Sequence, residues 1–324
     1  MARFLKKFLL WSVLALILVS LLDVFISRGL QETDQRKYAV WNDIYKGNAV
    51  ADLVVIGSSR AWCGYNTFIL DSLLHCNSYN LGIDGHPLDM QLIRYKTFRR
   101  FNPKPQIILL NTDYLSTLSI SADPRYEREQ FFPYFKDDEL IDDVASGKHF
   151  SIAERYFPLY RYYGYRKEIK TGIQAFLGKK EFEDGGLYKG YRGNEYKWNR
   201  GSLDSNDSLS VSPIDSLLLG LLYDFAKQSY EEGIQVFFVK SPVYERLTDK
   251  FRNISISDSI FTEVSEKYNC ILLDYYYSEI SKDSTNFYNP SHLNKKGSEI
   301  FTRQLCIDLQ PFIHPINKNE EIDQ

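Results

Sequence analysis

Cysteine and clustered basic residues are scarce in this sequence, and each scarcity excludes a class of protein. Only four of the 324 residues are cysteines, and no Cys-x-x-Cys pair occurs, so a zinc-binding knuckle is not expected. Acidic residues slightly outnumber lysine and arginine, which gives a net charge of −3, and the basic residues form no stripe. We therefore expect no nucleic-acid partner. No metal-ligand spacing stands out, and we predict neither a metal nor a cofactor.

The few cysteines leave two interpretations of their redox state. Cys63 with Cys76, and Cys270 with Cys306, could form disulfides in an exported chain, because an oxidising compartment favours them. Single buried thiols are the other interpretation, since free cysteine is among the most buried residue types. The spacing alone does not decide between them.

One long apolar run stands near the N-terminus. Three basic residues lie in the first seven positions, and residues 8–26 are then apolar apart from two serines and Asp23. Crossing a bilayer needs about 20 such residues, whereas a cleaved signal peptide has a shorter apolar region followed by small residues. We predict a cytoplasmic tip at 1–7 and an uncleaved signal anchor at 8–27, with the remaining chain facing outward.

Beyond residue 50, apolar strands alternate with amphipathic helices. This alternation predicts an α/β fold with three layers, α/β/α, around a central parallel sheet that is covered on both faces. Asn66 and Asn294 are expected to cap two of the helices. The predicted strands lie at 51–59, 78–85, 106–114, 234–244 and 270–276, and the predicted helices at 67–74, 88–101, 213–232, 258–268 and 294–313.

The regular alternation is interrupted between residues 120 and 211. This stretch is rich in aromatic and charged residues, in a chain that has 24 tyrosines and 21 phenylalanines. It is too long for a simple connection, so we expect an aromatic-rich insertion that either packs over the sheet or forms a lid. The predicted organisation is a stalk at 28–50, a domain at 51–315 that contains this insertion, and a polar tail at 316–324.

Residues suited to catalysis follow the predicted strands. Ligands of parallel sheets bind beyond the carboxyl ends of the strands, so these residues are expected to meet at one edge. Nucleophilic hydrolysis needs a hydroxyl, a base, a group that orients the base, and donors for the developing oxyanion. The candidates, in strand order, are Ser58 and Ser59, Gly82 and Gly85, Asn111 and Asp113, and Asn289 and His292.

These residues, in this order, resemble the motifs of the SGNH (GDSL-like) hydrolase family, whose central sheet is flavodoxin-like. The first block, Gly-x-Ser, corresponds to residues 57–59, and the last block, Asp-x-x-His, to residues 289–292. The resemblance implies that Ser59 is the nucleophile, that His292 accepts its proton and that Asn289 holds the imidazole. It also implies that the backbone N–H groups of Ser59 and of Gly85, or alternatively Gly82, bind the oxyanion.

Two positions depart from the pattern of the family. The third block, Gly-x-Asn-Asp, is replaced by Leu-Leu-Asn-Thr-Asp, so that Asn111 or Asp113 would assist the oxyanion. A carboxylate at Asp113 would repel an oxyanion unless it is protonated. Asn289 stands where the family has an acid, and an amide cannot stabilise an imidazolium by charge. Asp283 could supply that charge instead, and His86 is an alternative base.

The predicted anchor is typical of a subgroup of this family that acts on cell-envelope polymers. The chain resembles the esterase-like protein of teichoic acid D-alanylation and the proteins of alginate O-acetylation. That resemblance implies a single-pass protein of the bacterial cytoplasmic (inner) membrane, a serine esterase or O-acyltransferase that acts on an acylated surface glycan, with a possible membrane acyl-transfer partner. The alternative is a catalytically impaired protein that serves as a glycan-binding or assembly scaffold.

Overall fold

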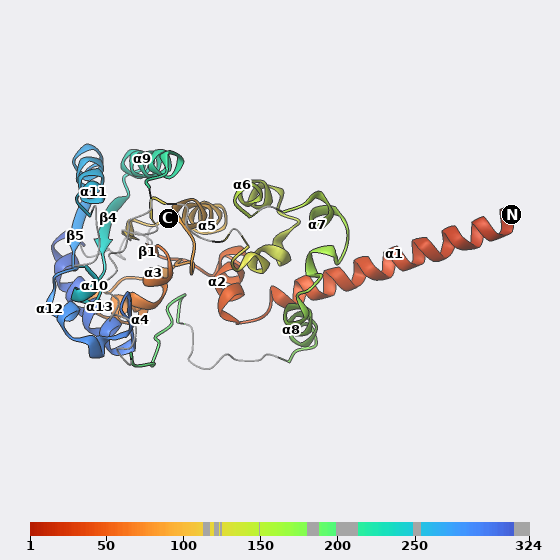
Figure 1. The fold of residues 1–324 in the computed structure, drawn as a ribbon, viewed down its shortest axis with the longest axis horizontal. Helices are drawn as coiled ribbons and strands as arrows, with labels where there is room; N and C mark the ends of the chain where they lie inside the picture. The colour runs from red at the N-terminus through yellow and green to blue at the C-terminus, as the bar shows by residue number, and fades with distance from the viewer. Residues whose placement is uncertain are drawn as a thin grey trace, which may run out of the picture. The chain divides into compact units, whose positions relative to one another are not determined.

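The computed structural model describes residues 1–112, 117–119, 123, 125–148, 150–179, 188–198, 213–248 and 254–313. The chain divides into two compact units, which are described separately below (Figure 1). Unit 1 consists of Met1–Tyr45 and Asp123–Asp184, and unit 2 consists of Lys46–Ala122 and Gly185–Gln324.

Unit 2 is built on a five-stranded sheet whose neighbouring strands are all parallel. The strand order is β2-β1-β3-β4-β5, which is the flavodoxin-like order, and it reverses direction between β1 and β3. The predicted α/β fold with a central parallel sheet is therefore confirmed. The strands are β1 (Leu53–Ile56), β2 (Ser78–Asn80), β3 (Ile107–Asn111), β4 (Gln235–Lys240) and β5 (Ile271–Asp274).

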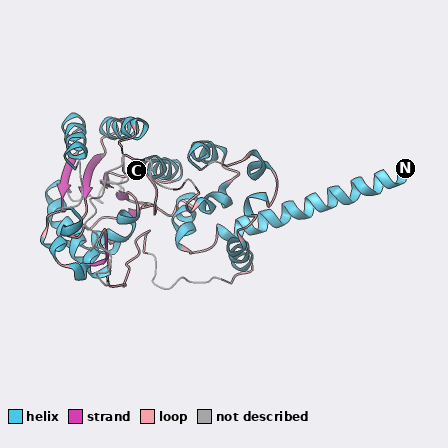
Figure 2. Cartoon of the chain, viewed as in Figure 1, coloured by secondary structure: helices cyan, strands magenta, loops and turns pink. Residues whose placement is uncertain are grey.

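Helices pack on both faces of this sheet (Figure 2). On one face, Val55, Leu109 and Val239 form a buried cluster with Phe301 of α13. On the other, the ring of Phe238 packs against Phe261 of α11, with 5.2 Å between ring centroids. Successive strand residues point to opposite faces, so continuous apolar strands satisfy both layers. The helices are α3 (Ser59–Gly64), α4 (Thr67–Leu74), α5 (Leu88–Phe101), α9 (Ser216–Glu231), α10 (Glu245–Thr248), α11 (Ile254–Tyr268), α12 (Glu279–Lys282), η3 (Ser284–Asn286), α13 (Lys295–Leu309) and η4 (Gln310–Phe312).

A small antiparallel hairpin lies between β5 and α13 in the chain. It consists of β6 (Phe287–Asn289) and β7 (His292–Leu293), joined by a two-residue turn. The next residue, Asn294, caps α13 by accepting a hydrogen bond from the N–H of Gly297 at 3.0 Å. Asn66 caps α4 in the same way, so both predicted caps are confirmed. The cap on α13 fixes the hairpin at the start of a long helix.

Unit 1 is helical in the part that the structure describes. Trp41 is fully buried, packs edge-on against Phe131, and donates to Gln130 Oε1 at 2.8 Å. Residues 28–45 of the predicted stalk belong to this unit, and Trp41 lies in its core. The predicted domain bounds stay a prediction. The helices are α1 (Ala2–Leu30), α2 (Arg36–Tyr45), η1 (Arg128–Tyr134), α6 (Asp138–Lys148), α7 (Ile152–Tyr156), η2 (Tyr160–Tyr162) and α8 (Arg166–Phe176).

Helix α1 contains the apolar run at the N-terminus. Among the described residues it is the one helix that is long and apolar enough to cross a membrane. By length and composition it could serve as a membrane anchor or as a signal sequence. Its side chains are exposed or partly exposed as far as Leu22, and Asp23 is the first buried residue.

All four cysteines are free thiols, so the disulfides considered from the sequence do not form. Cys306 belongs to the apolar cluster beneath the sheet, and Cys76 packs against the same cluster. Burial raises the pKa of Cys63, Cys270 and Cys306 to about 12. These thiols therefore act as small apolar side chains in the core.

Candidate active site

The turn after β1 is shaped by a glycine. Gly57 has a φ of +154°, and a Cβ at this position would lie 2.6 Å from the Cβ of Ala61 and 2.9 Å from that of Asn111. No other residue fits without moving these neighbours, so Gly57 allows the chain to leave the sheet sharply. Ser58 is buried at this turn, whereas Ser59 begins α3 and is partly exposed.

The structure brings Ser59 and His292 into direct contact. Ser59 Oγ lies 2.7 Å from His292 Nε2, although 233 residues separate them in the sequence. Ser59 is held by the turn after β1, and His292 by the β6–β7 hairpin. This distance is within the range in which a histidine can remove a hydroxyl proton. Of the two serines after β1, Ser59 is the one whose hydroxyl lies at this distance from the imidazole.

The other imidazole nitrogen faces Asn289. His292 Nδ1 lies 2.9 Å from Asn289 Oδ1 and 2.8 Å from the hydroxyl of Ser291. The backbone N–H of Ser291 donates to the same Asn289 Oδ1 at 3.0 Å, and the Ser291 hydroxyl lies 3.1 Å from it. Because a backbone N–H can only donate, this contact fixes the amide with its oxygen toward the histidine.

The fixed amide determines the tautomer of His292. Since Asn289 presents an oxygen, Nδ1 must carry the proton and donate it. Nε2 is then unprotonated and accepts the hydrogen of the Ser59 hydroxyl. An asparagine in place of the acid can hold a histidine in the wrong tautomer if its amide nitrogen faces the ring. The contact with Ser291 prevents that arrangement here.

Two site residues were missed in the sequence. Ser291 fixes Asn289, and the ring of Tyr288 packs beside the imidazole, with 5.3 Å between ring centroids. Ser291 could have been found, because an asparagine oxygen that accepts from the N–H two residues later forms an Asx turn, and Asn-Pro-Ser is a turn sequence. No sequence signal pointed to Tyr288, whose position depends on the register of the hairpin.

The second candidate block lies beside the turn at residues 57–59. The N–H of Ile83 donates to Gly57 O at 2.9 Å, which aligns the loop after β2 with the end of β1. The N–H of Gly82 already donates to Asn80 Oδ1 at 2.9 Å, and a Cβ on Gly82 would lie 2.6 Å from the nitrogen of Trp62. Gly82 therefore allows the loop after β2 to pack closely against the backbone of α3 at Trp62. Gly85 has a φ of +65°, a conformation that suits glycine, and its role as an oxyanion donor stays a prediction.

Asn111 ends β3 with its amide fixed as well. The hydroxyl of Tyr65 donates to Asn111 Oδ1 at 2.9 Å, so the amide nitrogen points the other way. Asn111 is fully buried, and its Nδ2 has no hydrogen-bond partner among the described residues. The Cβ of Asn111 borders Gly57. A buried donor that has no acceptor and lies next to the turn at Gly57 is suited to a developing negative charge. Asp113, the other candidate from this block, lies outside the described residues.

The alternative residues have other partners. Asp283 caps η3, accepts hydrogen bonds from the N–H and the hydroxyl of Thr285, and lies 3.4 Å from Lys296 Nζ. These hydrogen bonds, Thr285 first, lower the pKa of Asp283. It is therefore engaged at the start of η3 rather than with His292. The Nδ1 of His86 contacts the carbonyl of Asp84 within its own loop. In the described part of the chain, no group of three or more His, Cys, Asp or Glu could hold a metal.

The comparisons with known proteins give only distant likenesses. No family model matches the chain, and no curated protein matches it. One similar solved structure is described as a "putative acylhydrolase" from Bacteroides fragilis NCTC 9343, with a TM-score of 0.38 and 9% identity, covering 83% of this chain and 90% of that one. Another is a family two carbohydrate esterase from Clostridium thermocellum in complex with cellohexaose, with a TM-score of 0.35 and 12% identity, covering 81% of this chain and 64% of that one. Both scores are low, so the argument for function depends on the side chains of the site.

Proposed function

We propose that this protein is a membrane-anchored serine esterase or O-acyltransferase of the SGNH type. The observation that carries the proposal is the chain of contacts from Ser59 through His292 to Asn289. Each contact is of hydrogen-bond length, and the tautomer of the histidine is the one that a general base needs. Ser59 follows the carboxyl end of β1, and the hairpin brings His292 and Asn289 to it. Parallel sheets of this strand order bind ligands at that end.

The reaction begins with the Ser59 hydroxyl. His292 Nε2 takes its proton while Ser59 Oγ attacks the carbonyl carbon of an ester, and the N–H groups of Ser59 and Gly85 bind the oxyanion. Asn111 Nδ2 is a third donor. The protonated imidazole then gives its proton to the leaving alcohol, which leaves an acyl group on Ser59. Water or a sugar hydroxyl takes this acyl group in the second half of the reaction.

An acylated glycan of the cell envelope is the proposed substrate class. Three aromatic residues lie in or beside the hairpin that carries the histidine. The ring of Tyr288 lies beside the imidazole. The backbone N–H of Tyr244 donates to Pro290 O at 2.9 Å, and the backbone N–H of Trp198 donates to Phe287 O at 3.2 Å. The rings of Trp198 and Tyr244 lie 5.1 Å apart. Aromatic faces of this kind suit sugar rings, which have one apolar face.

Kinetics of ester hydrolysis test the catalytic proposal. Ser59→Ala and His292→Ala should each lower kcat for a small activated acetate ester by at least about 10³-fold. Ser58→Ala is the matched control, because Ser58 precedes the nucleophile but is buried, and it should keep most of the activity. If Ser59→Ala and the parent protein have equal activity, the proposed catalytic role of Ser59 is wrong. The full chain in detergent is required, because truncation at residue 28 would delete buried side chains of unit 1.

A second assay tests the substrate class. Trp198→Ala should raise KM for an acetylated polysaccharide by about tenfold, since a lost stacking contact costs about 1–2 kcal/mol. The same variant should leave hydrolysis of the small ester unchanged. If both substrates are affected equally, Trp198 supports the hairpin rather than a glycan.

A binding or assembly scaffold is the second candidate function. Asn289 favours it, because the site lacks the carboxylate that would stabilise an imidazolium by charge. A scaffold would bind the acylated glycan without turnover and would be unaffected by Ser59→Ala. A membrane protein that exchanges acyl groups is the proposed partner in either case.

A further inference from the structure

The end of α1 is locked into unit 1. Arg161 donates to Asp23 Oδ2 at 2.7 Å, and the N–H of Leu159 donates to Asp23 Oδ1 at 2.9 Å. Gly29 of α1 crosses Gly172 of α8 so closely that a Cβ on Gly29 would lie 1.7 Å from the carbonyl oxygen of Gly172. Helix α1 therefore leaves the unit at a fixed point, and Asp23 marks that point.

This junction shortens the apolar segment that is free to contact lipid. Lys7 is the last basic residue before the apolar run, and 15 residues separate it from Asp23. At a rise of about 1.5 Å per residue they span about 22 Å, whereas the hydrocarbon core of a bilayer is about 30 Å thick. The predicted span at 8–27 includes buried residues of unit 1, such as Ile26 and Ser27. About 8 Å of hydrocarbon therefore has to be matched by something other than α1.

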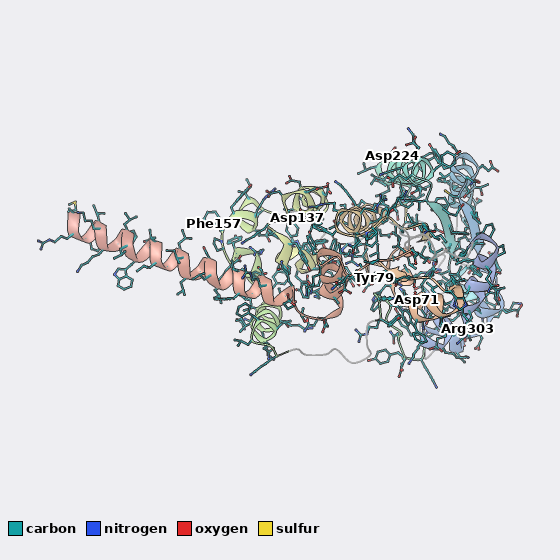
Figure 3. All side chains as sticks on the ribbon, turned by 180° about the vertical axis from the view of Figure 1, so that it is seen from behind. Asp71, Tyr79, Asp137, Phe157, Asp224 and Arg303 are labelled. Carbon is teal, nitrogen blue, oxygen red and sulfur yellow. The ribbon has the colours of Figure 1, made fainter. Side chains whose placement is uncertain are left out.

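Exposed apolar side chains surround the exit point. Phe157 and Tyr160 flank Leu159, which binds Asp23, and Tyr163 follows them. The ring of Phe176 packs on Phe25 at 4.6 Å between centroids. Figure 3 shows Phe157 at the edge of unit 1 from which α1 projects. We call these residues the collar: Phe157, Tyr160, Tyr163, Phe176 and Leu177, with exposed fractions from 43% to 88%.

We propose, on the basis of the membrane anchor in the proposed function, that the collar is seated in the interfacial layer of the bilayer that α1 crosses, so that lipid is its partner. Tyrosine and other aromatic residues concentrate at membrane interfaces, where the ring is apolar and the hydroxyl stays wet. Apolar groups of interfacial segments sink about 5–10 Å into the boundary of the acyl chains, which matches the length that α1 lacks. The collar is continuous with α1, and this continuity selects the bilayer rather than a protein as the occupant.

The charges around the collar agree with this placement. Arg161 and Asp23 neutralise each other in a buried pair with side-chain exposures of 7% and 11%. Helix α8, which ends at Phe176, also exposes three basic residues, Arg166, Lys167 and Lys170. Basic side chains near an interface are attracted to anionic lipid headgroups.

Spin labels placed on the full chain test the proposal. Single cysteines are introduced at the collar in Phe157→Cys and Tyr163→Cys and within the span in Leu14→Cys. Lys136→Cys is the control within unit 1. Lys136 is exposed, and its neighbour Asp137 accepts a hydrogen bond from the hydroxyl of Tyr45, the last residue of α2, at 2.6 Å. Each variant is labelled with a nitroxide in vesicles of phosphatidylethanolamine and phosphatidylglycerol, and the parent, with its native thiols, gives the background.

The measured quantity is the ratio of collisions with oxygen, which concentrates in lipid, to collisions with a water-soluble nickel chelate. We expect this ratio to be high at residue 14 and several-fold higher at residues 157 and 163 than at residue 136. A lipid-like ratio at residue 14 with water-like ratios at residues 157 and 163 would overturn the collar, because a thinned bilayer would then match the short span. A water-like ratio at residue 14 would show that α1 does not cross the bilayer, and the proposed position of the collar would then be wrong as well. Neither result bears on the Ser59 site.

Discussion

Replacing Asn289 with aspartate should increase the proposed esterase activity. Three contacts meet at Asn289 Oδ1, and they come from the N–H of Ser291, the hydroxyl of Ser291 and His292 Nδ1. Each of these groups can donate to a carboxylate as well as to an amide oxygen. Asn289→Asp therefore keeps the geometry and adds a negative charge, which stabilises the imidazolium that forms when Ser59 loses its proton.

The size of the gain follows from the strength of one hydrogen bond. A neutral hydrogen bond contributes about 0.5–1.5 kcal/mol and one to a charged group about 1.5–3 kcal/mol, so the carboxylate adds about 1–2 kcal/mol in the transition state. At about 1.4 kcal/mol per tenfold, kcat/KM should rise about 5- to 30-fold. In serine proteases, an Asp→Asn change at the equivalent position lowers kcat by about 10⁴, and that loss includes a wrong tautomer. The tautomer here is already correct, so a smaller gain is expected.

Hydrolysis of a small acetate ester by the full chain in detergent measures this effect. Asn48→Asp is the matched control, because it adds the same charge at an exposed loop position and should leave kcat/KM unchanged. A fall in kcat/KM of Asn289→Asp, with unchanged thermal unfolding, would contradict this prediction. It would show that the site depends on the amide nitrogen of Asn289 and not on its oxygen.

Three further predictions concern the turn, the junction and the thiols. Gly57→Ala should abolish activity and lower the thermal midpoint, because its Cβ would collide with Ala61 and Asn111; a variant with parent activity would contradict this account of the turn. Asp23→Ala should destabilise unit 1 by about 3–5 kcal/mol, measured by chemical denaturation, since Arg161 is left as a buried unpaired charge; the double variant Asp23→Ala with Arg161→Met should recover part of the loss. Burial raises the pKa of Cys63 to about 12, above that of an unfolded thiol. The stabilisation is therefore present below about pH 8.5 and lost as the pH rises toward 12, so the free energy of unfolding should fall over that window and the fall should be smaller in Cys63→Ala.

The sheet and the meeting of Ser59 with His292 could be predicted from the sequence for a simple reason. Apolar runs of strand length determine a parallel sheet, and a parallel sheet brings the residues after its strands to one edge. The same rule does not give side-chain orientation. The role of Asn289 depends on which amide atom faces the ring, and that is determined by the N–H of Ser291 through a two-residue turn. A pattern of residue types contains no information on that choice.

The packing of unit 1 could not be predicted from the sequence, for a different reason. In the sequence, Asp23 is an interruption of an apolar run, and residues 28–50 are a polar connection. The structure pairs Asp23 with Arg161, 138 residues away, and crosses Gly29 with Gly172. These contacts join segments that are distant in the chain, and none of them follows a helical or strand period. Local patterns could therefore identify α1 but not its partner.

The proposed function depends above all on Ser59 being an activated nucleophile. The most direct measurement is labelling of the full chain with a serine-directed fluorophosphonate, followed by mass spectrometry of the peptides. We expect one phosphonylated residue, Ser59, with labelling lost in His292→Ala and retained in Ser58→Ala. An unlabelled chain, or an adduct on Ser58 or Ser291, would contradict it.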